Sequence, residues 1–412
     1  MKINNNTINP IIKEIEFNYI PKALLDAGEK TWFSRVINCI IQSNPEDIIK
    51  HEYDINKHRW CVYHGPTFKM TLDKTTHSYH CFFDKLTGLN LRFGKTINDD
   101  PICCELGPEI LDLEISKNGC VPVKGSQNCS YCYKCNTNNK PTNMSFDTFK
   151  TILSKFPINL SQIAFGITGL QTNPDLPKMM QYCRQIGIIP NLTTVGADMS
   201  DNIKDIICKY AGACAVSCYT GAKQLCYKTI KELYKYAKDK YNREFHINMH
   251  ILISNDNREH LFDVLKDIAN NKVIGLKSIV FLRIKPCGRA KNIDCTISKK
   301  YYKEIITYCL NHNISFGFDS CSAIIVSNIL KDLNKIELAK YCEPCESSKL
   351  SSYINVNCEY WSCSFAENTN FIKPINVLRY NTINEWWNSE QINKIRFYNK
   401  SASVSCPIYN LD

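Results

Sequence analysis

The chain has 412 residues, 44% of them hydrophobic and 22% charged, with a formal net charge of +10. This composition excludes a disordered chain, a collagen and a coiled coil, and the length suffices for two or three domains. No run approaches the roughly 18 apolar residues of a membrane helix, and the segment after Met1 lacks the pattern of a secretory signal. We therefore expect a cytoplasmic protein without a membrane partner. The positive charges are scattered, so nucleic acid is not a favoured partner.

Cysteine is the unusual feature of the composition, with 23 residues. Their odd number, the length of the chain and the missing export signal disfavour a disulfide framework. Clustered thiols in a cytosolic chain indicate metal binding instead. Four other thiols occupy apolar-face positions of helical patterns, where we expect small core residues; these are Cys39, Cys183, Cys208 and Cys309.

Residues 1–105 alternate aromatic and polar side chains across glycine-containing turns, which predicts a small α+β module, with a possible role in docking a substrate. From residue 109 short apolar runs alternate with amphipathic helical stretches. Ser145 is placed to cap one helix and Gly187 to end the next. Six strands are predicted at residues 109–116, 162–168, 188–196, 213–219, 246–254 and 278–285.

Strands that alternate with helices require parallel pairing through right-handed crossovers. Residues 106–318 are therefore predicted to form an α/β sheet, open or curled into a barrel, with its site at the carboxyl ends of the strands. Residues 319–412 hold six cysteines and little apolar periodicity. A region with so little apolar periodicity is expected to have a small core and to need a cross-link or a bound metal for stability. We therefore expect a second metal site there.

The sharpest motif follows the first predicted strand. Cys120 leaves the strand, and Cys129 and Cys132 follow in a loop with Tyr131 between them. This loop resembles the cluster-binding loop of radical S-adenosylmethionine (radical SAM) enzymes. Three thiolates hold three irons of a [4Fe-4S] cluster and leave the fourth iron open for a cofactor. A zinc knuckle is the plainer alternative.

The resemblance implies a partial (β/α)6 TIM-like barrel. It also implies an enzyme that reductively cleaves S-adenosylmethionine to a 5′-deoxyadenosyl radical, which abstracts hydrogen from a substrate. The first gap, of eight residues, departs from the usual Cys-x3-Cys-x2-Cys spacing. An inserted loop tolerates this at small entropic cost, about 0.6 kcal/mol per doubling. Cys135 continues the even spacing of Cys129 and Cys132, so it competes with Cys120 as a ligand.

The resemblance also implies cofactor-binding residues at the strand ends. The second strand usually ends in a Gly-Gly-Glu-like segment; here Leu170 stands where the acid is usual, and we take Gln171 as its substitute. Arg283, Lys285 and Arg289 are candidates for holding an anion. The predicted cofactor-binding residues are Tyr131, Thr168, Gly169, Gln171, Thr194, Ser217 and His250.

The C-terminal segment resembles the SPASM or twitch-like extension of radical SAM enzymes that act on peptides and proteins. The resemblance implies a second, auxiliary [4Fe-4S] cluster saturated by four thiolates, with a role in electron transfer or scaffolding. Cys342 is a reserve ligand, Cys358 is expected to be a bystander, and a structural zinc ribbon is the alternative. The four predicted ligands are Cys321, Cys345, Cys363 and Cys406.

The predicted function is therefore hydrogen abstraction from a peptide or protein side chain, with a reductase or flavodoxin-type electron donor. The substrate class rests on the resemblance alone. A nucleoside or another small molecule is an alternative substrate. A zinc-stapled nucleic-acid-binding protein without catalysis is the alternative from a different functional class.

Overall fold

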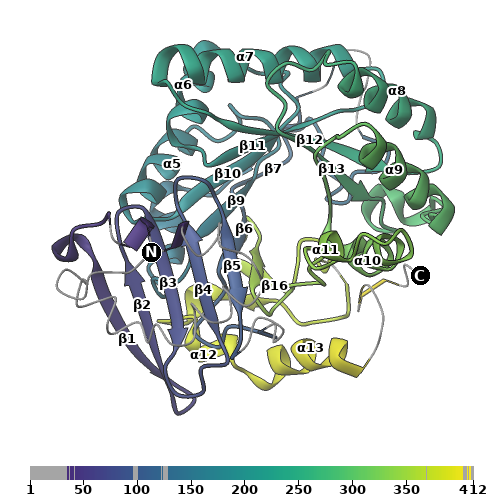
Figure 1. Cartoon of the computed structure of the whole chain (residues 1–412). Helices are drawn as coiled ribbons and strands as arrows, with labels where there is room; N and C mark the ends of the chain where they lie inside the picture. Colours follow the sequence, from purple (N-terminus) through teal and green to yellow (C-terminus); the bar gives the residue numbers. More distant parts are fainter. Residues whose placement is uncertain are drawn as a thin grey trace.

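The computed structural model describes residues 35–36, 38–40, 42–95, 101–121, 123, 129–367, 369–401, 406 and 408–409. In this part of the chain a five-stranded antiparallel sheet lies beside a ten-stranded, mostly parallel sheet that curls into an arc with helices outside it (Figure 1). None of the helices described combines the length and apolar character that crossing a bilayer requires.

The N-terminal sheet is a simple meander in which each strand pairs with the next. One face packs around Tyr63, Phe68 and Phe82. The other face carries Trp60 and packs against Leu350 from the C-terminal part of the chain. Residues 1–34 of the predicted module lie outside the described residues. The strands are β1 (Ile49–Ile55), β2 (His58–His64), β3 (Phe68–Asp73), β4 (His80–Asp84) and β5 (Asn90–Phe93), preceded by the 3-10 turn η1 (Pro45–Asp47).

The curled sheet confirms the predicted α/β fold class. The barrel part of the sheet has seven strands that pair in parallel, so the structure adds β14, which the sequence pattern did not predict, to the six expected strands. β14 is only three residues long and all three are half-buried, too short for a readable alternation. These strands are β6 (Ile110–Glu114), β9 (Gln162–Gly166), β10 (Ile189–Thr194), β11 (Ala213–Ser217), β12 (His246–Ile253), β13 (Ser278–Arg283) and β14 (Phe316–Phe318).

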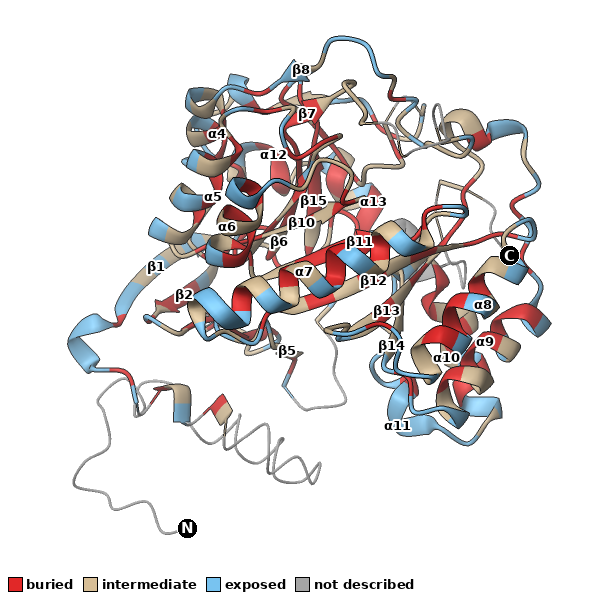
Figure 2. Cartoon of the chain, turned by 90° about the horizontal axis from the view of Figure 1, so that it is seen from above, coloured by how far each residue is buried: buried red, intermediate tan, exposed pale blue. Residues whose placement is uncertain are grey.

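The helices cover the outer face of the arc and turn their apolar sides inward (Figure 2). Local signals set their ends as expected. The Ser145 side chain accepts a hydrogen bond from the Thr148 amide at the start of α4, and Gly187 follows α5 with a φ of +71°. The helices are α4 (Phe146–Leu153), α5 (Leu176–Gln185), α6 (Asp201–Tyr210), α7 (Lys223–Tyr241), α8 (Arg258–Ala269) and α9 (Lys299–Asn311).

The cysteine-rich extension continues the same sheet. Its first strand, β15, pairs in parallel with β6, and β16 and β17 then pair antiparallel beyond it. Its core is aromatic, with the Tyr360 ring centroid 4.5 Å from that of Trp386. The elements are η3 (Ser320–Ser322), α10 (Ala323–Asp332), α11 (Ile336–Ala339), β15 (Ser351–Ile354), β16 (Glu359–Trp361), β17 (Ile375–Asn376), η4 (Val377–Arg379), α12 (Asn384–Trp387) and α13 (Glu390–Ser401).

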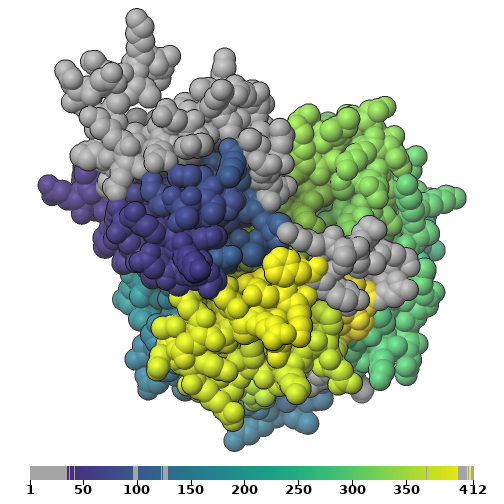
Figure 3. Space-filling model, turned by 90° about the horizontal axis from the view of Figure 1, so that it is seen from below, coloured from purple at the N-terminus to yellow at the C-terminus, as the bar shows by residue number. Residues whose placement is uncertain are grey.

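The N-terminal sheet and the C-terminal segment lie against each other, purple and yellow in Figure 3. Arg92 of β5 joins them to the barrel. Its guanidinium donates two hydrogen bonds of 3.0 Å to Glu109, just before β6, and reaches Glu343 and Glu346 at 3.1 and 3.2 Å. The indole N–H of Trp387 also donates to the Cys104 carbonyl at 2.8 Å.

We predict that Arg92→Ala lowers the free energy of unfolding by about 3 to 5 kcal/mol, because it leaves the buried Glu109 carboxylate without its cation. Urea unfolding measures this. The control is Lys178→Ala, which breaks an exposed pair with Asp175 and should cost less than about 1 kcal/mol. Equal losses in the two variants would contradict a joining role for Arg92.

Candidate active site

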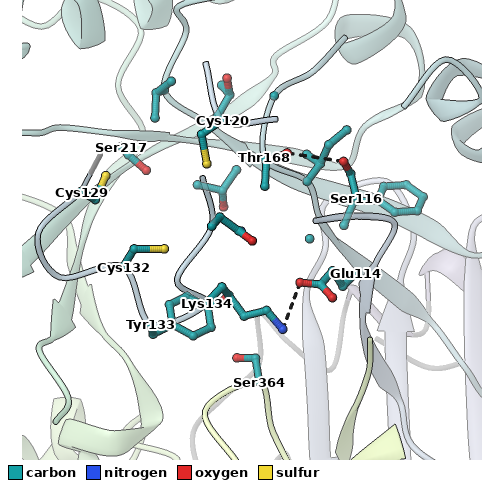
Figure 4. Close-up of a pocket in the computed structure, with 18 of the residues that line it drawn as sticks. Glu114, Ser116, Cys120, Cys129, Cys132, Tyr133, Lys134, Thr168, Ser217 and Ser364 are labelled. Atoms are coloured by element: carbon teal, nitrogen blue, oxygen red, sulfur yellow. Dashed lines mark hydrogen bonds and ion pairs between the residues drawn. The ribbon is translucent and has the colours of Figure 1, made fainter. Parts of the chain in front are cut away.

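The carboxyl ends of β6, β9, β10 and β11 and the middle of β12 face one cavity of about 560 Å³ inside the arc. Parallel strands bring the residues at their carboxyl ends to the same edge of a sheet, which is why this edge collects polar groups. Figure 4 shows the cavity with cysteines on one side and Glu114, Lys134 and Ser364 on the other.

Cys120, Cys129 and Cys132 all line this cavity (Figure 4). Burial raises the pKa of the Cys120 thiol, and the charges of Cys132 and Cys129 raise it further, because the three thiols are neighbours. Among the residues described, no three histidine, cysteine or acidic side chains already stand in a finished metal-binding arrangement. Most of the loop between Cys120 and Cys129 lies outside those residues.

Cys135 lies differently from the other loop cysteines. Its side chain is exposed, its backbone has a φ of +54°, and it is not among the residues that line the cavity. The structure thus brings Cys120, rather than Cys135, to the cavity beside Cys129 and Cys132. This placement supports the choice of Cys120 as a ligand, which stays a prediction.

The turn after β13 holds the cysteine loop in place. The Arg289 guanidinium donates to the Cys129 carbonyl at 3.0 Å and also to the Asn136 carbonyl, and the Arg289 amide donates to the Cys132 carbonyl at 3.0 Å. Gly288 precedes it in the 3-10 turn η2 (Gly288–Asn292) with a φ of +57°. A Cβ there would lie 2.4 Å from the carbonyl oxygens of Cys132 and Tyr133. Arg289 therefore positions the loop through its carbonyls.

Five of the seven predicted cofactor-binding residues line the cavity, namely Thr168, Gly169, Thr194, Ser217 and His250. Burial lowers the pKa of His250 to about 4, so its imidazole is neutral at pH 7. Ser217 and His250 are neighbours in the register of β11 and β12.

Tyr131 and Gln171 are not among the residues that line the cavity. Tyr131 packs with its ring centroid 6.2 Å from that of Tyr219. The Gln171 side-chain amide donates to the Asp198 carbonyl oxygen at 2.9 Å. Leu170 lines the cavity instead.

Several polar residues of the cavity were not predicted from the sequence. Asp198, after β10, lines it and keeps one buried carboxylate oxygen without a hydrogen bond. On β6 the alternate residues Asp112 and Glu114 both face it, and Lys134 pairs with Glu114 at 3.0 Å. The alternation in Ile-Leu-Asp-Leu-Glu was a readable signal for the two β6 acids. No pattern in the sequence predicts that Lys134 lies beside the β6 acids.

The four predicted thiols of the extension come close together. Burial raises the pKa of Cys321 to about 12, and the charges of Cys345 and Cys406 raise it further. Burial also raises the pKa of Cys363, and the charges of the other three thiols add to that effect. Each of the four thiols is therefore an electrostatic neighbour of the others.

Cys342 and Cys358 do not share in these mutual interactions. Burial raises the pKa of Cys342, and its one charged neighbour is Lys331. Cys358 is buried with a φ of +63°, and its charged neighbour is Glu359. The roles of Cys342 as a reserve ligand and of Cys358 as a bystander stay predictions.

A buried ion pair lies beside the second cysteine set. The Lys285 ammonium contacts Asp319 at 2.7 Å and sits 4.3 Å from the centre of the Phe365 ring. Charges of Asp319, Cys321 and Cys363 raise the pKa of Lys285 against the opposing effect of burial, which is the largest single influence. Lys285 is thus a fixed cation beside the second cysteine set.

No protein-family model matches the chain, and no curated protein matches its sequence. Its structure is similar to SuiB from Streptococcus suis, in crystals bound to S-adenosylmethionine (TM-score 0.51, 15% identity) and to the precursor peptide SuiA (TM-score 0.53, 14% identity). The chain therefore shares the fold of SuiB over the matched region. At this identity the likeness concerns the fold alone, and in the fold it agrees with the predicted resemblance to radical SAM enzymes. The match covers 70% of this chain and 66% of SuiB, so the chain spans about two thirds of SuiB.

We predict that Gly288→Ala displaces the loop that carries Cys129 and Cys132, because the new Cβ meets two loop carbonyl oxygens. The control is Gly221→Ala, which has a φ of +81° but open space around the new Cβ. Both variants carry left-handed backbone strain of about 1 to 2 kcal/mol. Only Gly288→Ala should also lower the iron retained after anaerobic reconstitution. Equal iron in the two variants would show that Gly288 does not support the loop.

Proposed function

We propose that the protein is a radical SAM enzyme. The observation that carries this proposal is the placement of Cys120, Cys129 and Cys132 on one cavity with polar residues from four neighbouring strands of this fold. In the proposal these three thiolates hold a [4Fe-4S] cluster, whose open iron site leaves room for a cofactor. Reductive cleavage of S-adenosylmethionine to a 5′-deoxyadenosyl radical is the chemistry such a cluster supplies when bound.

The chain's own residues would bind, orient and protect the reactants. Thr168, Gly169, Thr194 and Ser217 present hydroxyl and backbone groups at the strand ends, where a polar cofactor would lie across the sheet edge. Neutral His250 offers a hydrogen bond without adding charge. Leu170 and Phe365 line the cavity with apolar surface, which favours the exclusion of water from a reactive species.

The second thiol set would hold an auxiliary cluster. Cys321, Cys345, Cys363 and Cys406 offer four neighbouring thiols. A cluster with four thiolates has no open iron, so its role would be electron transfer or scaffolding. Lys285 would lie beside it as a permanent positive charge, which favours the more negative, reduced state.

A peptide or protein side chain is the substrate class that we propose. The support is the structural likeness to SuiB, which has been crystallised with its precursor peptide SuiA. We propose the domain division at residues 105/106 and 318/319, a docking role for the N-terminal module, a cytoplasmic location and a reductase or flavodoxin-type electron donor. A nucleoside or other small substrate remains the second choice.

The test of this function is the metal content of protein purified and reconstituted without oxygen. We expect roughly eight irons per chain in the wild type, for two clusters, and roughly four in Cys363→Ser. Cys363→Ser should still cleave S-adenosylmethionine, because it changes the auxiliary site alone. Cys358→Ser is the matched control and should keep all its iron. Stoichiometric zinc without iron would contradict the proposed enzyme. It would favour the alternative function, a zinc-stapled nucleic-acid-binding protein whose affinity for nucleic acid should fall steeply with salt.

The ligand choice in the loop has its own test. We predict that Cys120→Ala loses roughly four irons and no longer forms 5′-deoxyadenosine from S-adenosylmethionine under strong reduction. Cys135→Ala is the matched control and should keep both properties, because Cys135 is exposed and away from the cavity. Chromatographic detection of 5′-deoxyadenosine and iron analysis measure the two effects. Loss in Cys135→Ala alone would assign the third ligand to Cys135.

A further inference from the structure

Asp112 is a carboxylate on the cavity wall that the function proposed so far does not use. Asp112 lies on β6, two residues before Glu114, and both line the cavity. In the parallel register it lies between Tyr353 of β15 and Ala164 of β9. Two residues of strand correspond to about 7 Å. Asp112 is therefore deeper in the barrel than Glu114 and farther from the carboxyl edge that carries the cysteine loop.

The nearby acids have partners that Asp112 lacks. Glu114 and Glu367 both pair with the Lys134 ammonium, and the Tyr353 hydroxyl donates to Glu367 at 3.0 Å. The Arg289 guanidinium is occupied by backbone carbonyls of the cysteine loop. Within the described part of the chain, the Asp112 side chain accepts no hydrogen bond and forms no ion pair.

This arrangement is unfavourable for the protein without a ligand. Burial raises the pKa of Asp112 to about 6, so the carboxyl is ionised at pH 7, and the nearby Lys134 ammonium pairs with Glu114 and Glu367 instead of with it. The titratable groups around it are Tyr353 on β15, Glu114 on β6, and Tyr133 and Lys134 on the loop, while β9 contributes the uncharged Ala164. A ligand with a cationic N–H group would satisfy the carboxylate with a charge-assisted hydrogen bond.

We propose that Asp112 is a substrate-positioning residue that binds an alkylammonium or guanidinium group of the substrate. Such a group ends a lysine or arginine side chain, so the inference narrows the proposed substrate class to a basic side chain. It rests on the proposed function only in taking this cavity as the substrate site.

The experiment measures binding of small probes to the full-length, anaerobically reconstituted protein. The probes are n-butylammonium, neutral n-butanol and anionic butyrate, followed by ligand-observed NMR at pH 7.5. We expect n-butylammonium to bind about tenfold more tightly than n-butanol, as one charge-assisted hydrogen bond allows. Asp112→Asn should remove this preference. Asp147→Asn, at an exposed acid on α4, is the matched control and should keep it.

Two further measurements test whether Asp112 binds the substrate or the cofactor. Saturating S-adenosylmethionine should leave n-butylammonium bound; displacement would assign Asp112 to the cofactor and overturn the inference. Binding should weaken as the pH falls through about 6, where Asp112 gains a proton. Equal binding of n-butanol, or no effect of Asp112→Asn, would also overturn it.

Thermal unfolding checks that the variant folds. The pKa of Asp112 is raised above its unfolded value of about 3.9, so its ionisation destabilises the fold as the pH rises from about 4 to about 6. Asp112→Asn should therefore melt at a higher temperature than the wild type above pH 6, and the difference should vanish near pH 4. A lower melting temperature at neutral pH would show a structural partner and overturn the inference. Iron content and S-adenosylmethionine cleavage test the proposed function separately. They can stay unchanged when the inference about Asp112 fails.

Discussion

The parallel pairing of β6 with a neighbour on each side is the constraint on which the rest of the site depends. On one side β9 continues the barrel, and on the other β15 brings in the cysteine-rich extension. The carboxyl end of β6 leads into the loop that carries Cys120. A single five-residue strand thus sets the distance between the barrel cavity, the cysteine loop and the second cysteine set.

Buried charges then fix how these parts are oriented. Lys134 follows Cys132 by two residues and contacts both Glu114 of β6 and Glu367 of the extension. Arg92 connects the N-terminal sheet to Glu109 at the foot of the same strand. A buried ion pair adds little net stability over an apolar contact, but breaking one is costly. Such pairs therefore suit the task of holding separate segments in one arrangement around a cavity.

The extension builds its core in a way that differs from the rest of the chain. The barrel helices bury regular apolar stripes, whereas the extension packs Tyr360 against Trp386 and Trp387 and buries Arg396 among them. A few large rings cover much area with short elements. The extension therefore shows little apolar periodicity in its sequence, although it buries several large aromatic rings. The absence of a regular apolar stripe did not mean the absence of a packed core.

Much of the fold was readable from the sequence, because strand and helix periods and caps are local properties. Strands β6 and β9 to β13, the Ser145 cap and the Gly187 helix end are where the pattern put them. The strand order follows from handedness and short connections, so the meeting of strand ends at one edge was also predictable. The three-residue β14 escaped because it is too short to show a period.

The sequence by itself determined which residue types reach the carboxyl edge and that two groups of thiols exist. Only the tertiary structure decided that Cys120 faces the cavity while Cys135 is exposed, that Gln171 turns to Asp198, and that Lys134 neutralises Glu114 and Glu367 but leaves Asp112 without a cation. The physical reason is that side-chain direction and charge pairing depend on contacts between separate segments, which are 27 residues apart for Gln171 and Asp198 and 233 residues apart for Lys134 and Glu367. Local pattern carries no information about such contacts.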